Sequence, residues 1–279
     1  MSAEVWEPSI ETRADVVTEA AARALHDLLD RPGPAPAVGD PLPVLWQWLA
    51  FLPQARQSEL GADGHPMTGG FLPPTGGRRR MYAGGRSTST GTVRIGEPLQ
   101  RVSEVSEVVT KTGRSGELMF VTVDHRIGGA GGRVQERTDV VYKGADAGTA
   151  ARPAAQGVDE GAVWGREVPI DPPLLFRISA LTYNAHRIHY DREYATEVEG
   201  YPGLVVHGPL QALLLADAAA RAFPDRTVTG ISFRSTAPAF DRHPLSLRVR
   251  HGSDGAVQAA AYSDGIRTMT AAITLGGPA

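Results

Sequence analysis

The hydrophobic pattern of the first fifty residues predicts one helix and one short buried segment. Apolar residues recur at every fourth position from Val16 to Leu28, which places them on one face and predicts a helix over residues 11–30. The proline-rich run 31–36 ends this helix, because proline cannot continue it. Residues 45–52 are rich in tryptophan and leucine and predict a short helix or another buried segment.

Residues 61–85 are rich in glycine and proline and show no apolar period. A loop of this length is uncommon inside a compact domain, and it is usually a binding loop or a segment that wraps over the surface. It contains the basic run Arg78–Arg80. This run is either a solvated surface or a set of guanidinium groups that bind a ligand phosphate, so Arg79 and Arg80 are candidate substrate-binding residues.

Beyond residue 85 the pattern becomes that of strands in both halves of the chain. Segments rich in valine, threonine and aromatic residues are separated by glycine turns. The strands predicted in the first half are 99–112, 118–127 and 134–142. In the second half, helices are predicted at 174–184 and 209–223, followed by strands at 228–234, 245–252, 257–262 and 267–275.

The two halves share one order of elements, which predicts two copies of an α+β unit. Gly85-Arg-Ser-Thr in the first half resembles Gly230-Ile-Ser-Phe in the second, at an offset of 145 residues, and three strands follow each time. Each unit is expected to be a helix wrapped by an antiparallel sheet. The units are placed at residues 1–150 and 151–279, and the weakly patterned stretch 145–162 is the expected linker.

Composition narrows the class of protein. Hydrophobic residues make up 42% of the chain and charged residues 21%, as in soluble globular proteins. A net charge of −3 gives no general attraction to nucleic acid, so no nucleic-acid partner is expected. Without cysteine there is no disulfide, thiolate nucleophile or cysteine-based zinc site. We expect no secretory signal, no membrane span and a cytoplasmic protein, because no basic and apolar leader or long apolar run is present.

The candidate chemistry is concentrated in residues 177–191, where Asn184, His186 and His189 lie close together. Five positions along a continuous helix correspond to about 140°, so Asn184 and His189 would not share a face. For both to reach one substrate, the helix must end near Ala185 or His186. Asn184 is then on its last turn, and His189 is on the following loop.

A second feature is the start of the helix predicted at 209–223. Proline at the first helical position leaves the backbone N–H of Gly208 facing outward at the positive end of the helix dipole. Such a donor can stabilise a carbonyl oxygen that gains negative charge during a reaction. A histidine base together with this donor suits enolate chemistry on a thioester.

These segments resemble the hot-dog-fold hydratases of the MaoC type. They are most similar to the single-chain double-hot-dog branch, which contains mesaconyl-C4-CoA hydratase and the type 2 hydroxyacyl-thioester dehydratases. That branch shows the sequence of residues 184–191 and 200–209 almost unchanged. Matching motifs in the first half are Leu45-Trp-Gln-Trp-Leu, Asp63-Gly-His-Pro, Gly69-Gly-Phe-Leu-Pro-Pro, Arg79-Arg-Met-Tyr-Ala-Gly-Gly and Lys111-Thr-Gly-Arg-Ser-Gly. The resemblance thus covers nearly the whole chain beyond about residue 40.

The resemblance implies two fused hot-dog folds, of which the second is catalytic and the first is degenerate and walls the acyl site. It also implies roles for three residues: His189 as the acid/base that handles water, Asn184 as its orienting partner, and the Gly208 N–H as the oxyanion donor. Two positions depart from the pattern. Asn184 stands where the broader MaoC type has an aspartate, although the nearer branch also has asparagine. Ala185 replaces a glycine of that branch.

Several neighbouring residues keep two interpretations. His186 either lines the pocket or forms a hydrogen bond across the loop. Arg187 is a solvated charge or binds a second carboxylate of the substrate, and Arg234 is an ion-pair partner or contacts CoA. His186, His189 and His207 could form a metal site, but no carboxylate ligand accompanies them, and we expect no metal and no cofactor.

The predicted activity is the addition or removal of water across the 2,3-bond of an acyl-CoA or acyl-carrier-protein thioester, with mesaconyl-C4-CoA as one candidate substrate. Two alternatives remain at this point: a hot-dog thioesterase, since one fold hosts many functions, and a non-catalytic thioester-binding accessory protein. Release of free thiol would indicate the thioesterase, and tight binding without turnover the accessory protein. We further expect a homodimer.

Overall fold

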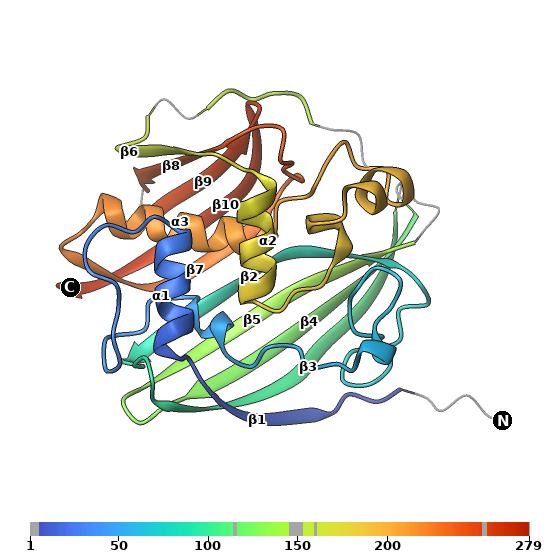
Figure 1. Ribbon diagram of the computed structural model, residues 1–279, viewed down its shortest axis with the longest axis horizontal. Coiled ribbons are helices and arrows are strands. Elements are labelled where there is room, and N and C mark those ends of the chain that lie inside the picture. Colours follow the sequence, from blue (N-terminus) through green and yellow to red (C-terminus); the bar gives the residue numbers. More distant parts are fainter. Residues whose placement is uncertain (1–5, 114–115, 145–152, 159–160, 253–255, 279) are drawn as a thin grey trace.

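The computed structural model describes residues 6–113, 116–144, 153–158, 161–252 and 256–278. The strands of these residues join in one antiparallel sheet, shown in Figure 1. They are β1 (Ile10–Val16), β2 (Arg79–Gly91), β3 (Pro98–Gly113), β4 (Gly116–Gly128), β5 (Gly132–Lys143), β6 (Trp164–Val168), β7 (Arg226–Ser235), β8 (Leu245–His251), β9 (Val257–Ser263) and β10 (Ile266–Pro278).

The sheet has an internal two-fold order. Its strands run β1-β3-β4-β5-β2-β7-β10-β9-β8-β6, so the second half repeats the order of the first in reverse. The two halves meet where β2 pairs with β7, from Gly84 opposite Arg234 to Thr88 opposite Gly230. The two segments that resemble each other in the sequence are therefore equivalent strands that lie side by side at the centre of the sheet.

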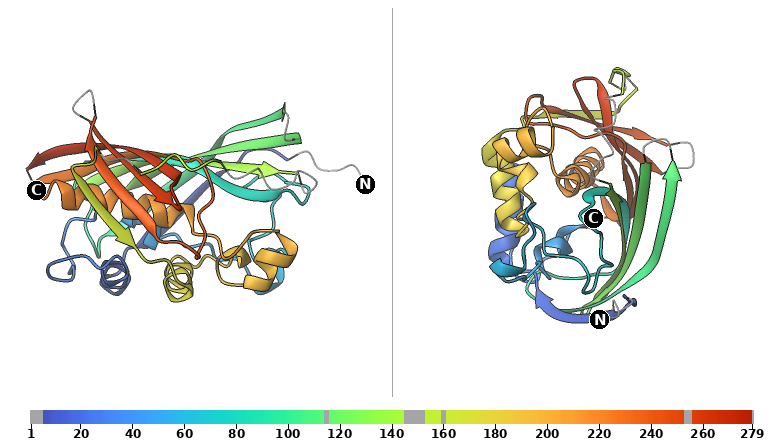
Figure 2. Two further views of the ribbon diagram at one scale, coloured as in Figure 1. Left: turned by 90° about the horizontal axis from the view of Figure 1, so that it is seen from above. Right: turned by 90° about the vertical axis from the view of Figure 1, so that its right-hand side faces the viewer.

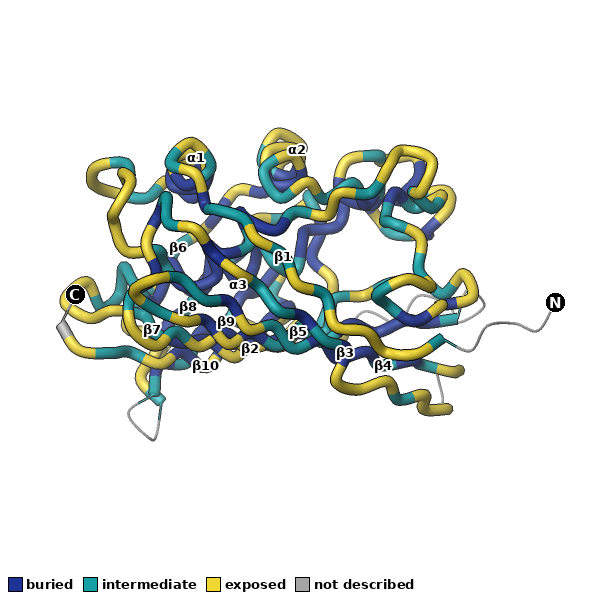
Figure 3. Tube along the Cα trace, turned by 90° about the horizontal axis from the view of Figure 1, so that it is seen from below, coloured by how far each residue is buried: buried dark blue, intermediate teal, exposed yellow. Residues whose placement is uncertain are grey.

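The helices form two layers on one side of the sheet. Helix α3 (Gly208–Ala222) packs directly on the strands of the second half; its residues 210–219 are buried and the others are half-buried. Helices α1 (Glu19–Leu28) and α2 (Pro172–Leu181) pack against each other farther from the sheet, as Figure 2 shows. In Figure 3 both carry exposed residues on their outer sides, whereas α3 is enclosed. The main hydrophobic core lies between these layers.

The described part of the first half has no counterpart of the long α3. At the equivalent place, between α1 and β2, the chain forms only two 3₁₀ turns, Trp46–Leu49 and Gln57–Glu59, joined by loops. Trp46 and Leu49 are buried, so the segment predicted at 45–52 fills part of the core. A four-residue turn fills much less space than a fifteen-residue helix, and the remaining space becomes a cavity.

Most predicted elements are confirmed, and three differ. Residues 11–16 form strand β1 instead of the start of a helix; Thr18 begins α1, because its side chain accepts a hydrogen bond from the backbone of Ala21. Strand β2 begins at Arg79, inside the predicted loop, since residues 79–91 pair with β5 and β7 on both sides. Strand β6 is an additional element, which the sequence did not predict.

The third difference is the end of α2, which stops at Leu181 instead of reaching Asn184. The expected linker 145–162 lies partly outside the described residues, and the boundary at residues 150 and 151 stays a prediction. Among the described residues, no helix combines the length and the apolar character needed to cross a membrane.

Candidate active site

The end of α2 fixes the position of Asn184. Tyr183 adopts a left-handed backbone with φ of 50°, and the Asn184 N–H then donates to Ser179 O at 2.8 Å. The Tyr183 N–H donates to Ala180 O at 3.3 Å. This pair of bonds is a Schellman motif, which ends a helix sharply. Asn184 is therefore outside the helix, and the helix does end before His189, as the spacing predicted.

The next residues turn His189 back toward the core. Asn184 Oδ1 accepts a hydrogen bond from the His186 N–H at 3.0 Å, which bends the chain behind the helix. Residues Arg187–His189 then form one 3₁₀ turn, in which His189 is buried. The amide oxygen of Asn184 is thus used by the backbone, and its NH₂ group remains as a donor.

Four imidazole rings form a row through this region. The ring centroids of His65 and His186 are 4.1 Å apart, those of His186 and His189 5.3 Å, and those of His189 and His207 3.6 Å. Burial lowers the pKa of all four rings, to about 2 for His186 and to about 4 for His189. All four are neutral at physiological pH, because a charged ring is poorly solvated there.

His189 has a defined tautomer. Its Nδ1 lies 2.7 Å from Val205 O, and a carbonyl oxygen only accepts, so Nδ1 carries the proton. The other ring nitrogen, Nε2, then has a lone pair and can accept a hydrogen bond or a proton. His207, stacked on the same ring, contacts Ser179 Oγ through Nε2 at 2.8 Å. His189 is thus a neutral base held in one orientation.

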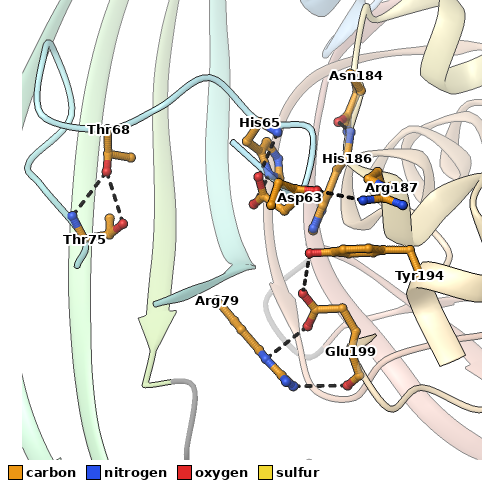
Figure 4. A network of polar contacts seen from close by, with 12 residues as sticks. Asp63, His65, Thr68, Thr75, Arg79, Asn184, His186, Arg187, Tyr194 and Glu199 are labelled. Carbon is orange, nitrogen blue, oxygen red and sulfur yellow. Dashed lines mark hydrogen bonds and ion pairs between the residues drawn. The ribbon is translucent and has the colours of Figure 1, made fainter. Parts of the chain in front are cut away.

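The loop of residues 61–66, from the first half of the chain, is docked on this segment (Figure 4). Asp63 O accepts the Arg187 N–H at 2.8 Å. A Cβ added to Gly64 would lie 1.9 Å from Ala185 O, so only glycine permits this approach, and its φ of 88° also favours glycine. His65 consequently lies against His186.

Asp63 and His65 form a hydrogen-bonded pair. Asp63 Oδ1 accepts the His65 N–H at 3.0 Å, and Oδ2 lies 3.1 Å from His65 Nδ1. Burial raises the pKa of Asp63, but the hydrogen bonds and charge of His65 outweigh this effect and lower the pKa to about 2. The carboxylate is therefore ionised and holds the ring proton on Nδ1, which leaves Nε2 of His65 with a lone pair.

Gly208 is the first residue of α3, and Pro209 follows it, as predicted. Within the described chain no acceptor takes the Gly208 N–H, since the first bond of the helix runs from Gln211 N to His207 O. A Cβ on Gly208 would lie 2.7 Å from Cδ1 of Tyr82, so a side chain has no room here. The free N–H at the helix start can stabilise an oxyanion.

A cavity of about 1190 Å³ extends from this site into the first half of the molecule. Asn184, His65, His207 and Pro209 line one part of it, and Trp48 and Glu136 line another. His186, His189 and Gly208 are not part of its wall, but each adjoins a residue of the wall: His186 the ring of His65, His189 the ring of His207, and Gly208 its neighbour Pro209. The cavity occupies the region where the first half has no long helix.

Arg80 is the cationic group of the cavity next to the histidines. It lines the cavity and is close enough to His65 and His186 to lower the pKa of both rings. Among the described residues it makes no hydrogen bond or ion pair. A β-bulge between Tyr82 and Gly84 shifts the alternation of β2 by one residue, so that Arg80 and Tyr82 face inward before the bulge and Ser87 does after it.

The other candidate arginines bind groups of the protein or lie on the exposed face of the sheet. Arg187 bonds to Asp191 Oδ2 at 2.7 and 2.9 Å and donates to Ala62 O, and Arg79 pairs with Glu199 at 3.2 Å. Arg234 is exposed; its neighbour Phe233 faces inward, and successive side chains of a strand point to opposite faces. Of the predicted substrate-binding arginines, Arg80 alone faces the cavity without a partner in the described chain.

Ligand atoms of Asp63, His65 and His186 lie within 4.8 Å of one another. Both carboxylate oxygens of Asp63 already accept hydrogen bonds from His65. This arrangement is that of a carboxylate and histidine pair that shares a proton, and it differs from the set of His186, His189 and His207 considered from the sequence. Asp63 and His65 were missed as site residues there, although the motif Asp63-Gly-His-Pro had been noted.

Comparisons with known proteins find related sequences over most of the chain. The family model of type 2 hydroxyacyl-thioester dehydratases matches residues 45–241. The chain is 44% identical to mesaconyl-C(4)-CoA hydratase of Chloroflexus aurantiacus over 273 residues, which cover 98% of this chain and 97% of that protein.

Solved structures show the same fold. A MaoC-like dehydratase from Phytophthora capsici has a TM-score of 0.68 at 14% identity, with 98% of this chain and 96% of that chain covered. A Mycobacterium tuberculosis protein with a double hot-dog fold has a TM-score of 0.57 at 13% identity, with 97% and 96% covered. The predicted α+β double hot-dog fold is confirmed.

Proposed function

The chain belongs to the type 2 hydroxyacyl-thioester dehydratase family, and from this premise we propose that it hydrates a short dicarboxylate monothioester of CoA, such as mesaconyl-C4-CoA. It is a hydro-lyase that adds or removes water at the 2,3-bond of an acyl thioester. The activity predicted from the sequence is thus confirmed, in preference to a thioesterase or an accessory protein. The acyl group and the roles of individual residues belong to the proposal.

In the proposed mechanism, water attacks C3 of the enoyl thioester while its electrons move toward the thioester carbonyl. His189 accepts a hydrogen bond from this water through Nε2, because Nδ1 is bonded to Val205 O. Asn184 borders the cavity beside it and orients the water through its NH₂ group. The carbonyl oxygen becomes negative, and the free N–H of Gly208 stabilises it.

The observation that carries the choice of substrate is the guanidinium of Arg80, which has no partner among the described residues. In mesaconyl-C4-CoA the free carboxylate is bonded to the carbon that receives the hydroxyl group, so its binding partner must lie near the water site. Arg80 lines the cavity beside His65 and His186. A guanidinium can bind a carboxylate through two parallel hydrogen bonds. Arg187, the first candidate from the sequence, already binds Asp191.

The test compares kcat/KM for mesaconyl-C4-CoA, crotonyl-CoA and an enoyl-CoA of ten or more carbons. We expect a preference for mesaconyl-C4-CoA of about 10²-fold, comparable to a charge-assisted contact of roughly 1.5–3 kcal/mol. Arg80→Gln should remove this preference and leave crotonyl-CoA turnover nearly unchanged. Arg86→Gln is the matched control, since Arg86 is an exposed residue of the same strand.

A preference for the long chain that persists in Arg80→Gln would contradict the dicarboxylate substrate and leave the hydro-lyase assignment intact. Carrier-protein thioesters of the same acyl groups, assayed in parallel, decide between CoA and a carrier protein. The cytoplasmic location and the homodimer stay predictions; light scattering of the purified protein tests the dimer.

A further inference from the structure

Hydration requires a group that takes a proton from water and delivers one to C2. Asn184 cannot do this, because an amide neither gains nor loses a proton near neutral pH. Among the described residues next to Asn184, the histidines have the side chain whose ordinary pKa lies nearest to neutral pH. Two of them, His65 and His189, have Nδ1 fixed by a partner and therefore offer Nε2 as a base.

The partners of these two rings differ in charge. Nδ1 of His189 donates to a neutral carbonyl, Val205 O, and His189 is buried. Nδ1 of His65 donates to the carboxylate of Asp63. An imidazolium ion that forms during a reaction is stabilised by a carboxylate on its other nitrogen and is poorly stabilised by a carbonyl. His65 is therefore the ring better able to carry a proton.

His65 also has access to the substrate. It lines the cavity together with Asn184 and His207, its ring lies 4.1 Å from that of His186, and its charge would lower the pKa of His189. The contacts of Asp63 O with Arg187 N, and of Gly64 with Ala185 O, hold it there although it comes from the first half of the chain.

We propose that His65, oriented by Asp63, is the acid/base residue that carries the proton from water to C2, while His189 accepts a hydrogen bond from the same water. The inference rests on the proposed mechanism, but not on the identity of the acyl group. It makes His65 a catalytic residue and Asp63 its positioning residue. The first half of the chain then contributes to the chemistry as well as to the wall of the site.

The proposed steps balance without a co-reactant. The water oxygen forms a bond to C3, one O–H bond of the water breaks, and His65 Nε2 takes that proton. The π electrons of the 2,3-bond move to the thioester oxygen, and the enolate is held by the Gly208 N–H. The enolate then collapses, and C2 takes the proton from His65. His189 accepts the second O–H of the water as a hydrogen bond throughout.

A purely structural role for the Asp63 and His65 pair makes different predictions. Asp63 Oδ1 closes a turn by accepting the His65 N–H, and this turn does not need the imidazole ring. If the pair only shapes the loop, loss of the ring should lower thermal stability and weaken substrate binding. If His65 carries the proton, loss of the ring should lower kcat and leave the fold and KM nearly unchanged.

The experiment uses any enoyl-CoA that the wild-type enzyme hydrates, so it does not depend on mesaconyl-C4-CoA as the substrate. We expect His65→Ala to lower kcat by about 10²–10⁴-fold with little change in KM. Added imidazole should restore part of this loss by entering the space of the missing ring. Asp63→Asn keeps the turn and removes the charge, and we expect it to lower kcat by at least about tenfold.

His26→Ala is the matched control. His26 is buried and its Nδ1 lies 3.1 Å from Asp27 Oδ1, as in the Asp63 and His65 pair, but it lies on α1 and does not border the cavity. Its activity should equal that of the wild type. The proposal is wrong if His65→Ala keeps more than roughly a tenth of kcat, if imidazole restores nothing, or if a chelator abolishes wild-type activity and Zn²⁺ restores it. Failure of the wild type to hydrate any enoyl thioester would instead contradict the function itself.

Discussion

At the scale of single residues, the two nitrogens of His189 have different surroundings. Nδ1 is bonded to Val205 O, and burial lowers the pKa to about 4, so Nε2 is an unprotonated acceptor at neutral pH. We expect His189→Ala to lower kcat/KM by about 10²–10⁴-fold while the protein stays folded. Steady-state kinetics beside thermal melting measure both. A folded variant with more than roughly a tenth of wild-type kcat/KM would remove His189 from the mechanism.

Asn184 offers a second prediction at this scale. Its Oδ1 accepts the His186 N–H, so an aspartate at this position can keep the turn, whereas alanine cannot. We expect Asn184→Ala to lower kcat with little change in KM, since the water loses its orienting donor. Asn184→Asp should retain a larger share of kcat than Asn184→Ala. Equal activity of both variants and the wild type would show that the amide does not touch the water.

Sequence reasoning selected candidate site residues that lie near each other in the chain. Asn184 and His189 are five positions apart, and this spacing predicted that the helix ends before His189, as α2 does. His65 was missed because it precedes Asn184 by more than a hundred residues, and no local pattern joins them. The partners of the arginines were equally hard to predict from the sequence. Only the tertiary structure shows that Arg187 binds Asp191 and that the Arg80 side chain has no such partner in the described chain.

At the scale of elements, the docking of the loop 61–66 depends on Gly64. Its φ is 88°, and a Cβ would lie 1.9 Å from the backbone oxygen of Ala185. Gly64→Ala must therefore push the loop away from residues 184–187. We expect a loss of about 1–3 kcal/mol in the free energy of unfolding and a drop in kcat of at least about tenfold, because a small displacement of a catalytic group is costly.

Gly33→Ala separates the two effects of this substitution. Gly33 has a φ of 87°, but a Cβ there meets no atom within 4 Å. The variant has the same backbone strain without the collision, so we expect a small loss of stability and unchanged activity. Urea unfolding and steady-state kinetics of both variants make the comparison. If Gly64→Ala behaves like Gly33→Ala, the contact between the two halves does not position the site.

The predictable elements of the fold were those with a strong local period. The strands of both halves and α3 followed from alternation, glycine turns and the proline at the helix start. Most of strand β1 falls in the predicted helix 11–30. Its short segment fits both the helical and the strand period of apolar residues, and only its pairing with β3 makes it a strand. The first part of strand β2, residues 79–85, falls in the predicted loop, because its glycine-rich sequence is a poor strand former and only its place between β5 and β7 makes it a strand.

At the scale of the whole molecule, the two halves repeat one strand order but differ in the segments that pack on the inner face of the sheet. The second half has α3, whose N-terminus supplies the free N–H of Gly208. The first half has only 3₁₀ turns at the equivalent place, and the cavity extends into that space. The absence of a long helix between α1 and β2 therefore leaves the space in which the proposed mechanism places the acyl group. The loop that takes part of its place brings His65 to the site.

The four buried imidazoles also give a prediction for the stability of the whole molecule. Burial lowers the pKa of His65, His186, His189 and His207 in the folded protein, to about 4 for His189, whereas in the unfolded chain each has its ordinary value of about 6.5. Above pH 6.5 both states are neutral and this contribution is constant. As the pH falls from 6.5 toward 4, the unfolded chain binds protons that the folded protein does not, so stability must decrease.

A difference of roughly 2.5 pKa units for His189 alone corresponds to about 3 kcal/mol. We therefore expect the free energy of unfolding, measured with urea at pH 8, 7, 6 and 5, to be level at first and then to fall steeply between pH 6 and 5. His189→Gln should reduce the slope, because one of the four titrating rings is absent. The carboxyl group of Asp63 affects stability at lower pH. Its pKa of about 2 in the folded protein is below its ordinary value of 3.8, so the stability it contributes is lost only as the pH falls below 3.8. Equal stability at pH 7 and pH 5 would mean that the four rings are solvated in solution and would contradict the lowered pKa of the buried imidazoles.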